Sequence, residues 1–469
     1  MDKIKSLFSE FAPVSAKQWK QKIQFDLKGA DYNEALLFES LEGITVKPFY
    51  NSEDVENKVN YTLPENHLWS IAQQVYSGNH ELANKKALDV LQRGAESLIF
   101  HVPEASVDFA QLLKDLNLNA TRIHFQFDFL EPERLQALFG LINSKSAGIH
   151  LNLDIIGNLA KTGNWYHNKS KDHQFVDEIL QMVKKQDAVS IISVDMACYQ
   201  NAGANIVQQL AYGLSQANEY LNHGPEMVSH INKKSITFKV AVGGNYFFEI
   251  AKLRALRWLW KSLAHEYQFE VEPHIVATPS LRNKTIYDYN VNMLRTNSEC
   301  MAAVLGGANT VCNLAYDAVY HKDNEFGERI ARNQLLLLKH ESYFDEAVHA
   351  ANGTYFIEAI TKQIAEEALA LFKQLEAGGG FLNQHQNGTI QRKIKESAQK
   401  EQALFDTGGQ VSIGTNAYQN KEDCMKGNLE LYPFVKTDKR KTEIEPVIQK
   451  RLAEAIEIKR LKAEQTQTM

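Results

Sequence analysis

The sequence predicts an α/β protein built on a (β/α)₈ TIM barrel, with an N-terminal extension and C-terminal helices. Short β-rich runs alternate with helical patterns through the middle of the chain, which favours parallel βαβ units. Eight such runs fall within roughly 250 residues, the usual size of this barrel. The runs occupy residues 69–76, 97–102, 122–129, 147–156, 188–197, 235–243, 270–278 and 308–317.

Helical patterns fill the segments between and after these runs. Apolar residues recur there at helical spacing, and glycine pairs and a triple glycine mark helix ends. The predicted helices cover residues 104–117, 247–265, 291–306, 326–342, 353–380 and 443–465.

The chain is expected to divide into three regions. Residues 1–68 form an N-terminal extension that serves subunit docking, and its Leu7, Phe8, Phe11 and Trp19 are more apolar than a free tail usually is. Residues 69–325 form the barrel. A C-terminal helical region, 326–469, completes the barrel and forms the tail.

Composition excludes several classes of protein. The 469 residues carry 51 basic and 57 acidic side chains, a net charge of −6, so nucleic acid is not an expected partner. No apolar stretch is long enough for a membrane span. The four cysteines are scattered without a C-x-x-C pair, and the N-terminus does not have the pattern of a signal peptide. We therefore expect a cytoplasmic protein.

Two central strands carry polar residues at every second position. Because the alternate positions are apolar and should face the helices, the polar ones should point into the barrel. The residues expected to line the barrel are His124, Gln126, Asp128, His150, Asn152, Asp154 and Lys239, joined by either Glu272 or His274.

A polar barrel interior allows three interpretations, since buried charges are costly unless they pair or meet a ligand. The side chains could satisfy one another in a closed network, or they could line a ligand channel. In a third interpretation, His124, His150, Asp128 and Asp154 ligate a metal ion in a hydrolase, but no ligand-spacing signature supports it. We expect the closed network and no metal site.

Five segments resemble the methylmalonyl-CoA mutase family, and in particular its small (β) subunits. The resemblance implies a (β/α)₈ barrel and the adenosylcobalamin-dependent interconversion of (R)-methylmalonyl-CoA and succinyl-CoA in propionate metabolism. In catalytic members the acyl-CoA threads the barrel axis, and the cofactor supplies the radical chemistry. The segments follow the family order and cover residues 19–50, 197–221, 243–260, 290–311 and 326–361.

The chain differs from the catalytic members at the residues that those members use for catalysis and substrate binding. A Tyr-His pair is replaced by Ala197 and Cys198, and neither side chain can stand in for a phenol or an imidazole. By the same resemblance, Ser235 replaces a CoA-binding arginine. Val276 and Thr278 replace a catalytic histidine and glutamine. The resemblance therefore implies no catalytic residues on this chain.

Some positions that lie near the cofactor in catalytic members persist as remnants. The family's flavodoxin-like cobalamin-binding domain, with its Asp-x-His-x-x-Gly motif, is not expected, because residues 383–388 have asparagine in place of the aspartate. We expect adenosylcobalamin only at the level of the complex, bound by the partner and not by this chain alone. The remnants are Gln200, Gly203, Asn245 and Glu249.

Together these features predict the small, non-catalytic subunit of a heterodimeric mutase, inactive alone, that stabilises the large (α) subunit. The predicted contact uses the N-terminal extension and the C-terminal helices. One alternative is a catalytic acyl-CoA mutase chain that works with a separate cobalamin-binding subunit. Another is an unrelated barrel enzyme that uses His124 and His150. Self-association in the absence of the partner is left open.

Overall fold

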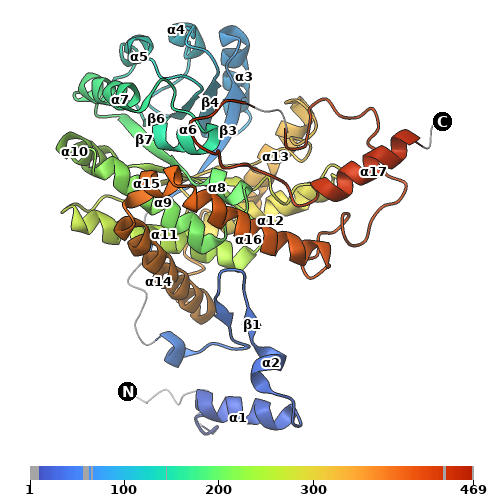
Figure 1. Ribbon diagram of the computed structural model, residues 1–469. Coiled ribbons are helices and arrows are strands. Elements are labelled where there is room, and N and C mark those ends of the chain that lie inside the picture. Colours follow the sequence, from blue (N-terminus) through green and yellow to red (C-terminus); the bar gives the residue numbers. More distant parts are fainter. Residues whose placement is uncertain (1–9, 56–62, 65–66, 144, 437–439, 467–469) are drawn as a thin grey trace, which may run out of the picture.

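The computed structural model describes residues 10–55, 63–64, 67–143, 145–436 and 440–466. Its centre is a closed barrel of parallel strands (Figure 1), which confirms the predicted fold class. Each strand pairs with its sequence neighbour, and the last pairs with the first. The strands are β3 Ser70–Tyr76, β4 Ser97–Val102, β5 Arg122–Phe127, β6 Ile149–Leu153, β7 Val189–Asp195, β8 Thr237–Val242, β9 His274–Pro279 and β10 Thr310–Cys312.

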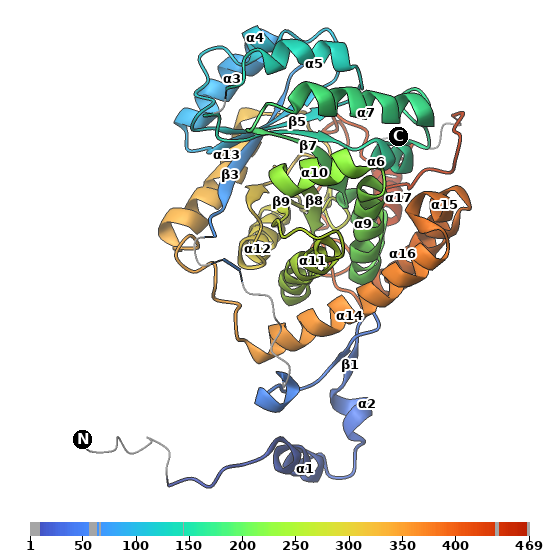
Figure 2. The ribbon, with the colours of Figure 1, turned by 90° about the vertical axis from the view of Figure 1, so that its left-hand side faces the viewer.

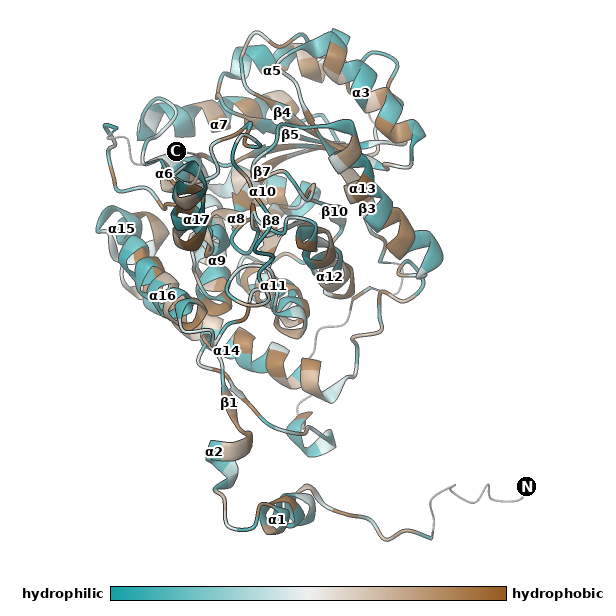
Figure 3. Ribbon diagram, turned by 90° about the vertical axis from the view of Figure 1, so that its right-hand side faces the viewer, coloured by the Kyte–Doolittle hydropathy of each residue, from teal (hydrophilic) through white to brown (hydrophobic). Residues whose placement is uncertain are grey.

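Helices surround the barrel, and Figure 3 shows brown and teal turns alternating along α3 and α5, as expected of helices with one apolar face on a sheet. Outward-facing strand residues such as Phe100 and Phe125 are fully buried beneath this layer. The helices are α3 His80–Gln92, α4 Phe109–Leu112, α5 Pro132–Phe139, α6 Ile155–Thr162, α7 Lys169–Val183, α8 Ala197–Asn201, α9 Ile206–Leu221, α10 Pro225–Lys234, α11 Tyr246–Glu266, α12 Val291–Leu305 and α13 Glu325–Leu336.

The N-terminal residues form a separate lobe beside the barrel. It contains α1 Ala16–Asp26, α2 Tyr32–Leu36, the antiparallel pair β1 Phe38–Glu39 and β2 Thr45–Val46, and a 3₁₀ turn Ser52–Val55.

Only part of this lobe packs on the barrel. The turn between β1 and β2 contacts α9, where Asn205 Nδ2 donates to the Leu41 carbonyl at 3.2 Å, and Ile44 is buried. Helix α1 contains no buried residue. Figures 1 and 2 show α1 set apart from the barrel, beyond α2 and β1.

Four helices follow the barrel, and α14 packs against α9 and α11. The triple glycine ends α14 as predicted, with Gly379 and Gly380 at positive φ, and α15 begins at once. A π turn, Leu337–Glu341, continues α13. No helix among the described residues is both long and apolar enough to cross a membrane. The C-terminal helices are α14 Tyr355–Ala377, α15 Gly380–Gln386, α16 Thr389–Asp406 and α17 Glu454–Thr466.

Two predicted helices are wrong in length. The one predicted over 104–117 is reduced to α4, because Asp108 caps its start and Asp115 takes a positive φ of 62° soon after its end. The one predicted over 443–465 begins only at Glu454. Its first residues run extended, because their amides donate to carbonyls at the barrel rim instead of closing helical turns.

Candidate functional site

The barrel interior brings together three imidazoles from strands that lie far apart in the sequence. His124 lies on β5, His150 on β6 and His274 on β9, and all three are buried. The ring centroid of His150 lies 4.4 Å from each of the other two, which are 5.2 Å apart. Of the two residues considered near β9, His274 points inward, whereas Glu272 precedes the strand and contacts Arg257 at 3.1 Å.

Threonine hydroxyls orient two of these rings. His150 Nδ1 lies 3.1 Å from Thr237 Oγ1, and His274 Nε2 lies 3.1 Å from Thr310 Oγ1. The Nε2 atom of His124 is buried and has no hydrogen-bond partner within the described part of the chain. Each ring therefore keeps one nitrogen outside the hydrogen bonds that orient it.

Burial keeps the three imidazoles uncharged. It lowers the pKa of His150 to about 3 and the pKa values of His124 and His274 well below their usual range. The positive charge of Arg122 acts in the same direction on all three. Neutral imidazoles carry a free lone pair, so the cluster can accept hydrogen bonds or ligate a metal ion.

A second interior cluster is apolar. Ala72 of β3, Ile99 of β4, Val276 of β9 and Cys312 of β10 are all buried and pack against one another. This arrangement is the usual filling of a TIM barrel, in which side chains of several strands close the axis. The interior is thus filled by imidazoles from β5, β6 and β9 and by apolar side chains from β3, β4, β9 and β10.

Lys239 forms an ion pair inside the barrel. Its Nζ lies 2.9 Å from Asp195 Oδ2, and both side chains are largely buried. Burial alone would raise the pKa of Asp195, but Lys239 and Lys161 hold it below its usual value. Lys239 therefore stabilises the ionised form of the Asp195 carboxylate.

Asp154 lies at the start of α6 rather than in the histidine cluster. Its carboxylate accepts from the Gly157 amide at 2.7 Å, the Asp195 amide at 2.8 Å, Gln216 Nε2 at 2.6 Å and the Tyr220 hydroxyl at 2.8 Å. Burial raises its pKa to about 6 although these donors oppose the shift. The carboxylate caps α6 and ties it to β7 and α9.

The expectation that Asp128 lines the barrel is wrong. Strand β5 ends at Phe127, so Asp128 lies outside the rim with its side chain 59% exposed and 2.8 Å from His101 Nε2. Gln126 is partly exposed at the same end of β5, opposite His101. Asn152 donates to the Phe125 carbonyl at 3.1 Å. The polar residues therefore form several separate groups instead of one network.

This placement predicts different stabilities for two aspartate variants. Asp154→Ala should lower the free energy of unfolding by about 3 kcal/mol, because it strands the buried donors of Gln216 and Tyr220. Asp128→Ala should change it by no more than about 0.5 kcal/mol, because its ion pair with His101 is exposed. Urea denaturation of both variants beside the parent chain measures the difference. Equal losses would contradict the assignment.

The positions singled out by family resemblance lie at the C-terminal end of the barrel. Ala197 and Cys198 begin α8 directly after β7. Cys198 is buried, and this burial raises the pKa of its thiol to about 12, so the group is neither a nucleophile nor an acid at neutral pH.

The remnant positions are occupied by contacts within the chain. Lys252 Nζ lies 2.5 Å from Glu249 Oε2 and 3.2 Å from Gln200 Oε1, all deeply buried. A Cβ at Gly203 would lie 2.5 Å from the Ala398 Cβ of α16. Asn245 is exposed and precedes α11 without capping it. Three of the four positions are therefore part of the packing of this chain.

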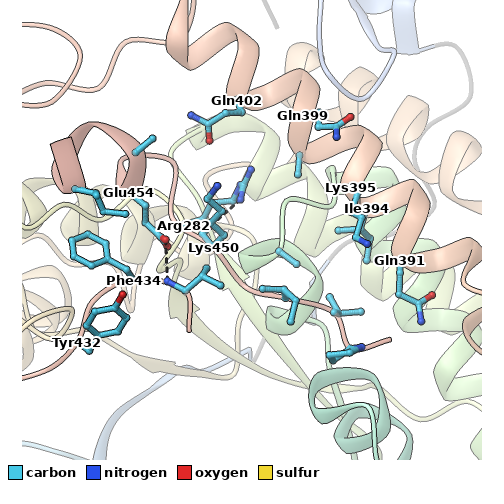
Figure 4. Close-up of a pocket in the computed structure, with 18 residues that line it drawn as sticks. Arg282, Gln391, Ile394, Lys395, Gln399, Gln402, Tyr432, Phe434, Lys450 and Glu454 are labelled. Atoms are coloured by element: carbon cyan, nitrogen blue, oxygen red, sulfur yellow. Dashed lines mark hydrogen bonds between the residues drawn. The ribbon is translucent and has the colours of Figure 1, made fainter. Parts of the chain in front are cut away.

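Residues 443–453, here called the C-terminal strap, cross the same end of the barrel. A cavity of about 590 Å³ lies between the strap, α16 and α17 (Figure 4). At its edge Arg282 joins α16 to the strap, with Nε 2.5 Å from Glu401 Oε2 and Nη1 2.8 Å from the Lys450 carbonyl. Strap amides of Ile444, Val447, Lys450 and Leu452 donate to the carbonyls of Gly163, Ala160, Asn201 and Arg282.

Sequence reasoning missed the buried ion pairs at this end. Lys284 with Glu299 and Arg282 with Glu401 join residues 15 and 119 positions apart, and no local pattern links them. Only the Glu249–Lys252 pair could have been predicted from the sequence, because side chains three residues apart on a helix can contact each other.

Comparison with known proteins gives consistent matches over most of the chain. The family described as methylmalonyl-CoA mutase matches residues 137–467. The methylmalonyl-CoA mutase small subunit of Porphyromonas gingivalis is 33% identical over 88% of this chain and 71% of its own length.

Two further relatives are longer than this chain. The methylmalonyl-CoA mutase of Cereibacter sphaeroides is 27% identical, over 86% of this chain and 64% of that protein. The methylmalonyl-CoA mutase large subunit of Streptomyces virginiae is also 27% identical, over 87% of this chain and 63% of that protein. The chain thus spans less than two thirds of either.

Proposed function

Since the chain belongs to the methylmalonyl-CoA mutase family, we propose that it is the small, non-catalytic subunit of a heterodimeric methylmalonyl-CoA mutase. Its large subunit would interconvert (R)-methylmalonyl-CoA and succinyl-CoA, and this chain would stabilise it. The names of its relatives support the proposal, since this family includes both a small and a large subunit.

The observation that carries the proposal is the chemistry of Ala197 and Cys198. Catalytic members place a tyrosine and a histidine there, and this chain places a methyl group and a buried thiol whose pKa is about 12. Neither can replace a phenol or an imidazole as a hydrogen-bonding catalyst near neutral pH.

The barrel interior supports the same conclusion. Val276, at the position of a catalytic histidine, belongs to the apolar cluster with Ile99 and Cys312. An acyl-CoA that threads the barrel needs the space that these side chains and the three imidazoles fill. Binding it would therefore require repacking of the core, which costs several kcal/mol.

The remnant positions do not fit adenosylcobalamin. Lys252 engages Gln200 and Glu249 below the rim, and Ala398 closes the space over Gly203. These side chains join α8 to α11 and pack α16 against the turn after α8 rather than present free groups to a ligand. We therefore propose that the cofactor binds to the large subunit.

We also propose that the N-terminal lobe docks the large subunit. Helix α1 exposes two aromatic side chains, with Trp19 54% and Phe25 80% exposed. An obligate interface usually buries more than about 2,000 Å² and is rich in such aromatic groups. Leu7 and Phe8 of the predicted docking segment lie outside the described residues. The C-terminal helices are proposed as the second part of this interface.

Co-expression with a large subunit tests the proposed function. The two chains should elute together from a size-exclusion column, and mutase activity should reside in that complex. If the large subunit is equally active and equally stable without this chain, the proposal is wrong. If this chain binds adenosylcobalamin in equilibrium dialysis, the assignment of the cofactor to the large subunit is wrong.

A further inference from the structure

The three interior imidazoles bring ring nitrogens of β5, β6 and β9 close together. Atoms of His124, His150 and His274 that can ligate a metal all lie within 4.8 Å of one another. The hydrogen bonds to Thr237 and Thr310 occupy one nitrogen each, which leaves Nε2 of His150 and Nδ1 of His274. His124 Nε2 is buried without a partner among the described residues, so each ring has a nitrogen that makes none of these hydrogen bonds.

We propose that His124, His150 and His274 bind one Zn²⁺ ion inside the barrel. Three neutral imidazoles with one open position are a common zinc ligand set, and imidazole favours late first-row divalent ions. The threonine hydroxyls supply the contacts that metal-bound histidines usually make through their other nitrogen. The proposal concerns the stability of this chain and does not depend on its role in the mutase.

Binding requires a modest rearrangement of the rings. Ligand nitrogens in a tetrahedral zinc site lie about 3.3 Å apart, as Zn–N bonds of 2.0–2.1 Å dictate. The rings of His124 and His150 are stacked, with 14° between their planes, so their lone pairs must turn toward a common point. Rotation about the Cβ–Cγ bond, which is a soft torsion for histidine, achieves this.

A cavity gives the ion a path from solvent. It has a volume of about 360 Å³, lies at the N-terminal ends of the strands, and is lined by His150, His274 and Ser190 among others. Arg122 also lines it, and its buried Nε has no hydrogen-bond partner among the described residues. Because the guanidinium charge repels a dication, we assign the fourth ligand to a small anion, hydroxide or chloride, next to Arg122.

The bound ion would link β5, β6 and β9 across the barrel. Asp128 and Asp154, considered as ligands from the sequence, take no part, because they lie at the opposite end of the strands. The chain offers a matched control on its surface, where His173, His223 and Asp177 also lie close together. Adventitious binding of metal would occur there.

The test uses the full chain, stripped with EDTA and titrated with Co²⁺ as a spectroscopic substitute for Zn²⁺. We expect one equivalent to bind, with the intense visible absorption of four-coordinate Co²⁺. Zn²⁺ should compete for the same site and raise the Tm by about 3 °C or more. Absence of one-to-one binding at micromolar concentration, or a six-coordinate spectrum, would overturn the proposal.

Paired variants separate ligation from packing. His150→Asn removes Nε2 but can keep the hydrogen bond to Thr237, so it should fold yet weaken Co²⁺ binding by at least about 100-fold. His274→Gln removes Nδ1, keeps the contact to Thr310, and should give the same loss. His223→Asn should leave binding unchanged. If instead His223→Asn abolishes binding, or both interior variants retain it, the ion binds elsewhere.

Discussion

The purified chain is expected to form no succinyl-CoA from (R)-methylmalonyl-CoA, even with adenosylcobalamin present. Proton-transfer catalysis by a positioned side chain contributes 10²–10⁴-fold, and Ala197 and Cys198 supply none. The radical chemistry is lost as well if the cofactor does not bind. The rate should therefore fall at least about 10⁴-fold below that of the two-chain complex, measured by succinyl-CoA formation under identical conditions.

Restoring the catalytic pair should not restore activity. The double variant Ala197→Tyr/Cys198→His adds the missing phenol and imidazole at the start of α8. Cys198 is 4% exposed, so the larger ring has to displace its neighbours. The interior apolar cluster with Val276 would still close the barrel. Succinyl-CoA formation above background by the parent chain would refute the non-catalytic role. Activity of the double variant alone would refute the claim that the barrel interior is closed to substrate.

The barrel could be predicted because its signal is local and repeated. All eight predicted β-rich runs overlap a barrel strand, since alternation of apolar and polar residues and the βαβ order need no tertiary information. The family resemblance is likewise confirmed by the relatives. The two helices whose predicted lengths are wrong lie where tertiary contacts determine the backbone conformation. In the strap, for example, backbone amides donate to carbonyls at the barrel rim.

The candidate site was only partly visible in the sequence. Strand alternation placed His124 and His150 on one face, but it could not choose between Glu272 and His274, since that depends on where β9 begins. The contact of His150 with His274 depends on the tilt and stagger of a closed barrel, which no single strand reveals. Asp128 was misplaced because the sequence does not show that β5 ends one residue earlier.

One part of the N-terminal lobe packs on the barrel, and another part remains for contact with the large subunit. The turn between β1 and β2 packs on α9 through Leu41 and Ile44, and Tyr50 lies 5.4 Å from the Phe356 ring of α14. These contacts belong to the fold of this chain. Helix α1 contributes no buried residue: the Trp19 ring lies 6.0 Å from that of Phe49, yet Trp19 and Phe25 stay largely exposed and can contact another surface.

Deleting residues 1–30 should therefore abolish complex formation while leaving the fold intact. The deletion removes α1 and keeps the β1–β2 pair and Tyr50, so circular dichroism should show a loss of helix no larger than the 11 residues of α1, and a similar Tm. Co-purification with a tagged large subunit should be lost. Aromatic side chains at the centre of an interface often contribute 2 kcal/mol or more each, and every 1.4 kcal/mol is tenfold in affinity.

Point variants on α1 locate the effect. Trp19→Ser with Phe25→Ser should weaken binding of the large subunit by about 100-fold or more, because the substitutions remove both exposed aromatic rings of α1. Lys17→Ser with Gln24→Ser, two exposed polar positions of the same helix, should change affinity by less than threefold. Stable co-purification of the truncated chain would show that α1 is not the docking element. Equal losses in both double variants would indicate that the helix itself has unfolded. The aromatic contacts would then be excluded as the source of the affinity.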